Sequence, residues 1–272
     1  MDLETYATVK RSIRSLLDID LDYYKDEQMR RRLDAWLVRS GRKTWPDYFT
    51  AIKGSEPDIA KLRDYLTINV SAFFRDPDRW DYLRDTIVPM ILKGRQAISG
   101  GQLGAKLRIW SAGCSIGLEP YSLAMMLEEQ GHGGRYEIVA TDLDRGALAR
   151  SKARGPYVPE DTVNVSAAFK AKYFEPGGPP FRVVDRLQRR ISFSEHNLVT
   201  MPPAGKDFDL VLCRNVVIYF TEPAKADLYR KFYDSLRPGG ILFVGGTEVV
   251  SQAAQIGFKS AGISFYQRPE AS

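Results

Sequence analysis

The sequence contains little cysteine or histidine and no long apolar run. Its 272 residues include only two cysteines, Cys114 and Cys213, and two histidines, too few to build a metal site from these ligands. We therefore predict no metal site and a reduced compartment. No stretch reaches about 18 apolar residues, and the opening MDLETYATVKRS lacks the apolar core of a signal peptide. We expect a cytoplasmic protein without membrane insertion.

Length and charge add two broader expectations. A chain of 272 residues usually forms two domains. The formal net charge of +5 suits an acidic partner such as nucleic acid, a phospholipid surface or a carboxylate-rich protein, and does not choose among them. A monomer is the default expectation.

The first third of the sequence predicts an all-helical domain. Residues 1–92 carry apolar side chains at helical spacing, as in Met29, Leu33, Trp36 and Leu37, and show almost no alternating pattern. Residues 93–106, KGRQAISGGQLGAK, form the polar, glycine-containing type of segment that links domains. We place the domain boundary in this linker.

Residues 107–272 alternate short apolar runs with helical segments. The runs LRIW, EIVATD, RRISFSE, DLVLCRN and ILFVGG are typical of buried strands, and helices are expected between them. This order predicts an α/β domain with a mostly parallel, doubly wound sheet. Residues at about 178–194 are rich in β-prone side chains, which favours a small β-subdomain, and IGFKSAGISFYQ would add closing strands.

The strongest local motif is a glycine-containing turn after the first strand. In RIWSAGCSIG, Gly113 and Gly117 would permit a ligand to approach the backbone closely. Ser115 replaces the second glycine of a dinucleotide fingerprint, and no Gly-Lys-Ser/Thr follows as in a P-loop. A ligand-binding turn is favoured over a merely tight connection between strand and helix.

Polar residues follow the next three strands as well. Asp142 ends EIVATD, Asn197 lies in SEHNL and Asn215 lies in LCRNVVIYF. Because ligands of open α/β sheets collect at the carboxyl ends of the strands, these residues predict one crevice, with Asp142 placed to bind ribose hydroxyls. Asp142 could also be a helix N-cap, and Asn215 a turn residue.

Taken together, the motifs resemble the CheR family of chemotaxis receptor methyltransferases. WSAGCSIGLEPYSLAMML, ATDLDRGALARSKARGPY, SEHNL, FDLVLCRNVVIYF and LRPGGILFVGGTE carry the resemblance, and NVSAFFRDPDRW at residues 69–80 is similar to the family's signature at the end of its helical domain. The resemblance implies a Rossmann-like S-adenosylmethionine-dependent methyltransferase domain with a small β-subdomain, preceded by an all-helical domain. It implies transfer of a methyl group to glutamate side chains of methyl-accepting chemotaxis receptors, with S-adenosylhomocysteine as product.

The resemblance also assigns residues that contact the cofactor. They are Asn69, Ser71, Arg75, Ala112, Gly113, Asp142, Asn197, Leu198, Asn215 and Val216. One position departs from the family, whose members usually carry two acidic residues after the glycine turn. Here Leu118 precedes Glu119, and the first of these positions is the one expected to contact the cofactor.

A glutamate carboxylate is ionised at neutral pH, since its reference pKa is about 4.3, and needs no general base. Catalysis would therefore consist of positioning the carboxylate near the methyl group without water. Arg75 and Tyr219 are the candidates for orienting it, through a planar donor fork and a phenolic donor. Arg75 could instead contact the cofactor carboxylate, and Tyr219 could belong to the core.

A basic segment at residues 25–43 is the candidate surface for docking the cytoplasmic helical domain of a receptor. Its docking candidates are Arg31, Arg32 and Arg39, and we place Arg32 and Arg39 on the outer side of a helix, toward an acidic helical substrate. The alternative is that these charges simply form a solvent-exposed helix face with no role in binding. FEPGGPPFRVV lacks the glycine-spaced loop of members that bind a receptor C-terminal pentapeptide, so we expect no such tethering.

Two rival functions remain. A nucleic-acid methyltransferase would fit the basic charge, but Asn215-Val-Val-Ile is not the Asn-Pro-Pro-Tyr of amino-group methylation, and Cys213 does not follow a proline as the cytosine C5 nucleophile usually does. A non-catalytic sensor or scaffold that binds S-adenosylmethionine would fit a site altered at Leu118. A nicotinamide oxidoreductase lacks its glycine fingerprint.

Overall fold

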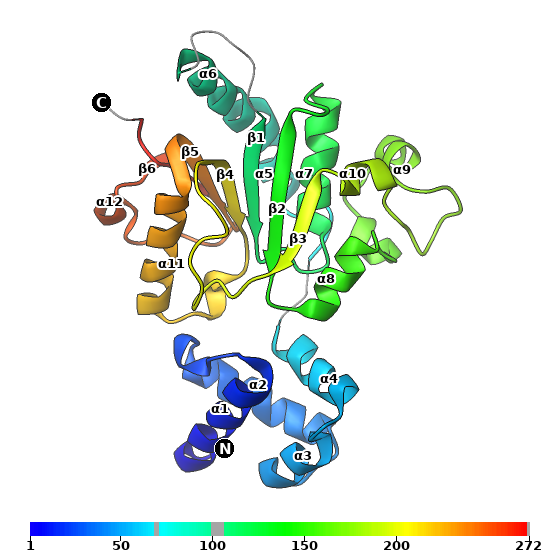
Figure 1. The fold of residues 1–272 in the computed structure, drawn as a ribbon, viewed down its shortest axis with the longest axis vertical. Coiled ribbons are helices and arrows are strands. Elements are labelled where there is room, and N and C mark those ends of the chain that lie inside the picture. The colour runs from blue at the N-terminus through cyan, green and yellow to red at the C-terminus, as the bar shows by residue number, and fades with distance from the viewer. Residues whose placement is uncertain (68–70, 99–105, 271–272) are drawn as a thin grey trace. The chain divides into compact units, whose positions relative to one another are not determined.

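The computed structural model describes residues 1–67, 71–98 and 106–270. They form two compact units, Met1–Ile68 with Ile218–Lys225 and Asn69–Val217 with Ala226–Ser272. The first is helical and the second is built on a sheet (Figure 1).

The helical unit contains α1 (Leu3–Leu17), η1 (Leu21–Tyr23), α2 (Asp26–Arg39), α3 (Trp45–Ile52) and α4 (Glu56–Leu66). Asp2 caps α1 by accepting the Thr5 N–H at 2.8 Å, and Tyr6, Val9 and Ile13 bury one stripe of this helix, as the helical period requires. The segment Ile218–Lys225 joins this unit through the Lys25 N–H, which donates to the Tyr219 carbonyl at 2.9 Å.

The second unit is a seven-stranded sheet in the order β3-β2-β1-β4-β5-β7-β6. Its strands are β1 (Leu107–Ala112), β2 (Tyr136–Asp142), β3 (Ile191–Glu195), β4 (Phe208–Cys213), β5 (Leu236–Val244), β6 (Lys259–Gly262) and β7 (Phe265–Gln267). The first five run parallel, whereas β7 is antiparallel to β5 and β6 is antiparallel to β7. The order reverses at β1 and β4, where doubly wound sheets bind ligands. The predicted fold class is confirmed.

Helices cover both faces of this sheet (Figure 1). The helical elements that follow α4 in the chain are α5 (Pro77–Tyr82), η2 (Leu83–Ile87), α6 (Val88–Ile98), α7 (Leu118–Glu129), α8 (Arg145–Lys152), η3 (Pro159–Thr162), α9 (Ala167–Tyr173), α10 (Asp185–Gln188), η4 (Val217–Tyr219), α11 (Glu222–Ser235) and α12 (Ala253–Ile256). Successive residues of β1 serve opposite faces, because side chains alternate along a strand. Ile109 joins the core cluster of α5 to α7, whereas Trp110 packs edge-on against Phe232 of α11.

The helical unit is shorter than we predicted from the sequence. Our boundary lay in residues 93–106, but the first unit ends at Ile68, and Trp80, Leu83 and Ile91 bury their side chains in the core of the sheet unit. Helical spacing identifies an apolar stripe without identifying the core that it joins. Helix α6 also extends to Ile98, into the predicted linker, whose residues 99–105 lie outside the described ranges.

The β-rich region before β3 also differs from the prediction at about 178–194. Phe181 and Val183 form isolated antiparallel bridges with Tyr157 and Phe174, so the excursion begins earlier in the chain than we placed it. Ile191–Glu195, which we had included in the subdomain, is β3 of the main sheet. The period of two residues is the same in both settings, and the sequence pattern does not separate them.

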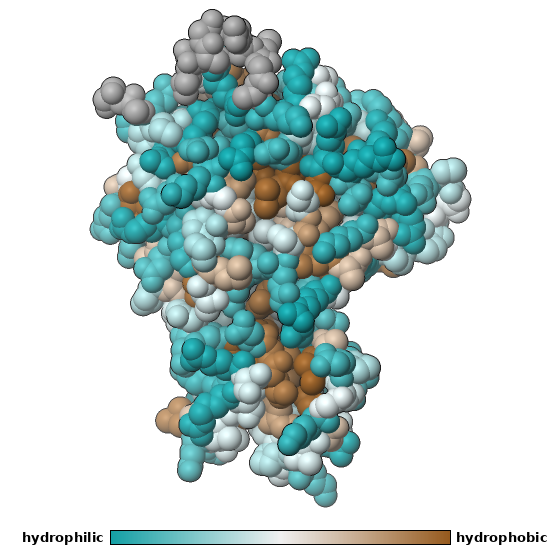
Figure 2. Space-filling view, in the orientation of Figure 1, coloured by the Kyte–Doolittle hydropathy of each residue, from teal (hydrophilic) through white to brown (hydrophobic). Residues whose placement is uncertain are grey.

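Polar side chains cover most of the face shown in Figure 2, and hydrophobic ones gather in smaller areas. Within the described ranges, none of the helices is long and apolar enough to span a bilayer.

A buried carboxylate anchors helix α6 and strand β5 to β4. Asp209 is fully buried in β4. Its Oδ2 accepts the Arg108 N–H at 2.8 Å and a bond from Arg95 of α6, and its Oδ1 accepts from Arg237 Nε at 2.5 Å. Removing a buried ion's partner leaves the remaining charge uncompensated.

Asp209→Ala is therefore expected to lower the free energy of unfolding by about 3–5 kcal/mol, measured by urea denaturation followed by circular dichroism. Asp234→Ala, at an exposed position in α11, is the matched control and should change this free energy by less than about 0.5 kcal/mol. Equal effects of the two substitutions would contradict an anchoring role.

Candidate functional site

The turn after β1 is joined to the end of β2 by backbone hydrogen bonds. The N–H groups of Gly113 and Cys114 donate to the Thr141 carbonyl at 2.8 and 2.9 Å. The Ser115 N–H donates to Asp142 Oδ2 at 2.7 Å, and the Asp144 N–H donates to Asp142 Oδ1 at 2.9 Å. Asp142 is thereby fixed at the carboxyl edge of the sheet.

The helix-cap interpretation of Asp142 is wrong, because Asp144 caps α8. The Asp144 Oδ1 accepts the Ala147 N–H at 2.9 Å. Asp142 is half-buried, and burial raises its pKa above the ordinary value even though the Ser115 and Asp144 N–H groups lower it. A carboxylate held this way at a strand end is suited to accept hydrogen bonds from ribose hydroxyls.

Gly113 brings the turn against the segment after β4. Its φ is +79°, and a Cβ at this position would lie 2.6 Å from Val216 Cγ2. Both the backbone conformation and the contact therefore require glycine. Ala112, fully buried at the end of β1, precedes it, so the turn after β1 packs directly against Val216.

The residues after β3 lie at the same edge. The His196 N–H donates to the Asp142 carbonyl at 2.9 Å. Asn197 Oδ1 accepts the N–H groups of Val199 and Thr200 at 3.1 and 3.3 Å, an Asx type of turn that contains the buried Leu198. The structure thus brings the predicted Asn197 and Leu198 close to Asp142.

Asn215 follows β4 in a left-handed conformation, with φ of +60°. Its N–H donates to Glu248 Oε2 at 2.8 Å, and the Gly245 N–H donates to the same oxygen at 2.6 Å. Asn215 Oδ1 and Glu248 Oε1 are buried and have no hydrogen-bond partner among the described residues. Buried acceptors of this kind call for a donor, and a ligand rich in hydroxyl and amino groups would supply it.

The loop that carries Ser71 and Arg75 also belongs to the sheet unit. The Phe74 N–H donates to Ser122 Oγ of α7 at 3.0 Å, and the Arg75 carbonyl accepts from Trp80 Nε1 at 2.9 Å. Asn69 lies outside the described residues. Tyr219 lies in the segment that groups with the helical unit, so its predicted role in orienting the substrate stays a prediction.

We expected the side chain at position 118 to contact the cofactor, but Leu118 does not face the site. It is 1% exposed and packs in the core of the sheet unit. The next residue, Glu119, accepts the Ser111 hydroxyl at 2.7 Å, and burial raises its pKa. The carboxylate in the first turn of α7 is therefore that of Glu119, and position 118 contributes an apolar side chain.

One of the three predicted docking arginines is already engaged inside the helical unit. Arg32 is half-buried, donates to the Tyr65 carbonyl and lies 4.7 Å from the centre of the Tyr65 ring. It is therefore not available on the outer side of the helix, because its planar group stacks on an aromatic neighbour. Arg31 and Arg39 are exposed.

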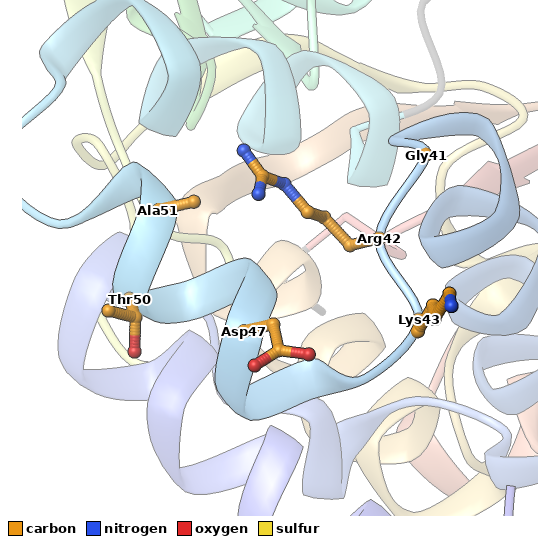
Figure 3. A pocket seen from close by; sticks show the side chains of 6 residues that line it. All are labelled: Gly41, Arg42, Lys43, Asp47, Thr50 and Ala51. Atoms are coloured by element: carbon orange, nitrogen blue, oxygen red, sulfur yellow. The ribbon is translucent and has the colours of Figure 1, made fainter.

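A shallow depression follows α2 on the helical unit. It is lined by Gly41, Arg42, Lys43, Asp47, Thr50 and Ala51. Figure 3 shows the Arg42 side chain extending across it toward Ala51, whereas Lys43 points away. Arg42 and Lys43 are both exposed, which continues the basic surface of Arg31 and Arg39 along the chain.

Sequence reasoning missed two buried charged residues at the site. Arg214 and Glu248 are 8% and 6% exposed, and each contacts the loop or turn that carries a predicted residue. They stand in the motifs LCRN and GGTE, but a charged residue at a strand end is usually solvated. The sequence did offer one signal for each residue: Arg214 directly precedes the predicted site residue Asn215, and Glu248 follows shortly after a Gly-Gly pair at the end of a predicted strand.

Comparison with known proteins gives two family matches and many relatives. Residues 4–67 match "CheR methyltransferase, all-alpha domain", and residues 69–266 match "CheR methyltransferase, SAM binding domain". A chemotaxis protein methyltransferase of Listeria innocua is 37% identical over 97% of this chain and 98% of its own length. Chemotaxis protein methyltransferase 1 of Pseudomonas aeruginosa is 36% identical over 81% of each chain. The family boundary at residues 67–69 coincides with the boundary between the two compact units.

Two substitutions of Glu248 should distinguish the contribution of its hydrogen bonds to stability from the contribution of its charge. Glu248→Ala leaves two N–H groups without their acceptor and should lower the free energy of unfolding by about 2 kcal/mol. Glu248→Gln keeps an acceptor oxygen and removes a charge whose burial is unfavourable, as its raised pKa indicates, so its cost should be smaller. Urea denaturation measures both. A Gln variant as unstable as the Ala variant would argue against this role.

Proposed function

Since the chain belongs to the CheR methyltransferase family, we propose that it methylates glutamate carboxylates of methyl-accepting chemotaxis receptors, with S-adenosylmethionine as methyl donor. The observation that carries the proposal is the carboxyl edge of the sheet, where Asp142, Asn197 and Asn215 meet within a chain that matches the SAM-binding domain over residues 69–266. Its relatives along nearly the whole chain are named chemotaxis protein methyltransferases.

The residues at this edge fit the cofactor. Asp142 would accept the ribose hydroxyls, and Gly113, which packs closely against Val216, would place the backbone of the turn beside the same ligand. Asn197 and Leu198 would flank the base. Asn215 and Val216 would lie beside the same ligand, and Asn215 Oδ1, which has no hydrogen-bond partner among the described residues, would accept one of its donors. Asn69, Ser71 and Arg75 complete the proposed set.

The cofactor supplies a methyl group on a positively charged sulfur, and the protein's part is to hold the acceptor. A glutamate carboxylate is already the nucleophile at neutral pH. Arg75 would bind it through two parallel N–H donors, which fix its plane as well as its position. Tyr219 would add one O–H donor. Holding the carboxylate in line and without water would account for the rate.

The exposed basic residues of the helical unit would dock the receptor. Arg31 and Arg39 of α2 continue into Arg42 and Lys43 beside the depression of Figure 3, and a helix carrying several glutamates offers the complementary charge. We expect a monomer that works in the cytoplasm, without tethering to a receptor C-terminal pentapeptide and without binding nucleic acid.

Calorimetric titration with S-adenosylmethionine and S-adenosylhomocysteine is expected to give micromolar dissociation constants, which correspond to a binding free energy of about −8 kcal/mol. Asp142→Ala should abolish detectable binding because it removes the acceptor for the ribose hydroxyls. Asp234→Ala, an exposed site in α11, should bind like the unmodified protein. Binding without methyl transfer to receptor fragments would favour the sensor or scaffold, and no binding would reject the enzyme.

Charge reversal should weaken receptor docking alone. The double variant Arg31→Glu, Arg39→Glu is expected to raise KM for a receptor fragment about tenfold or more at low salt, since two attractive contacts become repulsive. Its dissociation constant for S-adenosylmethionine should stay unchanged. Arg135→Glu, at an exposed position in the sheet unit, is the matched control. A KM equal to that of the control would place docking on another surface.

A further inference from the structure

A buried arginine connects the end of β4 to the loop that carries Arg75. The Arg214 side chain is 3% exposed. Its Nη2 donates to the Arg75 carbonyl at 2.8 Å and to Asp76 Oδ2 at 2.7 Å. Its Nη1 lies 3.9 Å from Glu119 Oε2. One guanidinium thus links β4, the loop before α5 and the first turn of α7.

The loop needs such support because its backbone is strained. Phe74 and Asp76 both have left-handed conformations, with φ of 51° and 60°, which cost non-glycine residues roughly 1 kcal/mol or more each. Conformations of this kind persist only where their surroundings hold them. Here the Phe74 N–H is held by Ser122 Oγ, and the Arg75 carbonyl between them accepts from both Trp80 and Arg214.

The surroundings of Arg214 restrict it to one orientation. Its guanidinium carbon lies 4.6 Å from the centre of the Phe243 ring and 5.7 Å from that of Trp80. A planar group packed on two rings aims its donors in fixed directions. Lysine would keep the charge at this position but could not reach Asp76 and Glu119 with separate nitrogens of a rigid fork.

We infer that Arg214 is a positioning residue: it fixes the strained loop of residues 74–76 and thereby aims Arg75 at the substrate carboxylate. The inference rests on the role proposed above for Arg75. It assigns Arg214 no contact with substrate or cofactor, and its effect on turnover passes through Arg75.

A double-mutant cycle tests this dependence. The specificity constant kcat/KM for methyl transfer to a receptor fragment is measured for the unmodified protein, Arg214→Lys, Arg75→Lys and the double variant. Arg214→Lys alone should lower kcat/KM about tenfold or more. In the Arg75→Lys background it should lower kcat/KM less than about twofold, because the guanidinium that the loop would position is already absent. Thermal unfolding of each variant supplies the second readout. A purely structural role would lower the melting temperature and the activity alike in both backgrounds.

Two further variants keep the cycle decisive. Arg237→Lys changes another largely buried arginine, one paired with Asp209 away from this loop, and its effect should be the same in both Arg75 backgrounds. Asp76→Asn weakens the same contact from the partner side, which is 41% exposed, and should couple to Arg75 as Arg214→Lys does, even where Arg214→Lys fails to fold.

The outcomes separate the inference from the proposed function. Full activity of Arg75→Lys would refute the role of Arg75 and the inference with it. Impaired Arg75→Lys with additive losses from both Arg214→Lys and Asp76→Asn would overturn the inference alone. Coupled losses from either of these variants would support it.

Discussion

Buried charge at the carboxyl edge of a parallel sheet is the constraint on which the site depends. The turns that follow β1, β4 and β5 present backbone N–H groups that no strand can satisfy, and a buried donor without an acceptor costs about 1–3 kcal/mol. Asp142 accepts from the turn after β1, and Glu248 accepts from the turns after β4 and β5. These carboxylates are therefore structural supports of the turns as well as parts of a polar surface for a ligand.

The same supports keep unfavourable backbone conformations in place. Ser115, Asn215 and Asp76 all have positive φ, and each is held by a carboxylate or a guanidinium: Asp142, Glu248 or Arg214. Burial raises the pKa of both Asp142 and Glu248, so ionising these carboxyl groups in the folded protein has a cost. Backbone strain and desolvated carboxyl groups thus occur together at this edge, as expected where geometry matters more than stability.

The sequence was sufficient for the fold and for most of the edge. The mostly parallel sheet, the glycine turn and the places of Asp142, Asn197 and Asn215 after their strands depend on local patterns that parallel topology brings together. The domain boundary could not be derived this way, because the stripe of Trp80, Leu83 and Ile91 fits either core. Arg32 was misplaced for a related reason, since helical spacing does not reveal that Tyr65 occupies the space above it.

The contacts of the charged supports could not be derived from the sequence, because their partners are distant in the chain. Arg214 reaches residues 75 and 76, and Glu248 reaches residue 215. In each case the contact depends on which loops the sheet order places side by side. A propensity scale treats both residues as surface residues, so only the three-dimensional arrangement reveals that they are buried.

The departure at Leu118 is explained by the same balance of charge. Asp142, Glu119 and Glu248 are three carboxyl groups whose pKa values burial raises, and Arg214 is the buried cation that lowers those of Glu119 and Glu248. A fourth carboxylate at residue 118, which is 1% exposed in an apolar cluster, would add a desolvation cost without a cation to offset it. Leucine at this position instead fills the core beneath the turn, while Glu119 keeps a carboxylate in the first turn of α7.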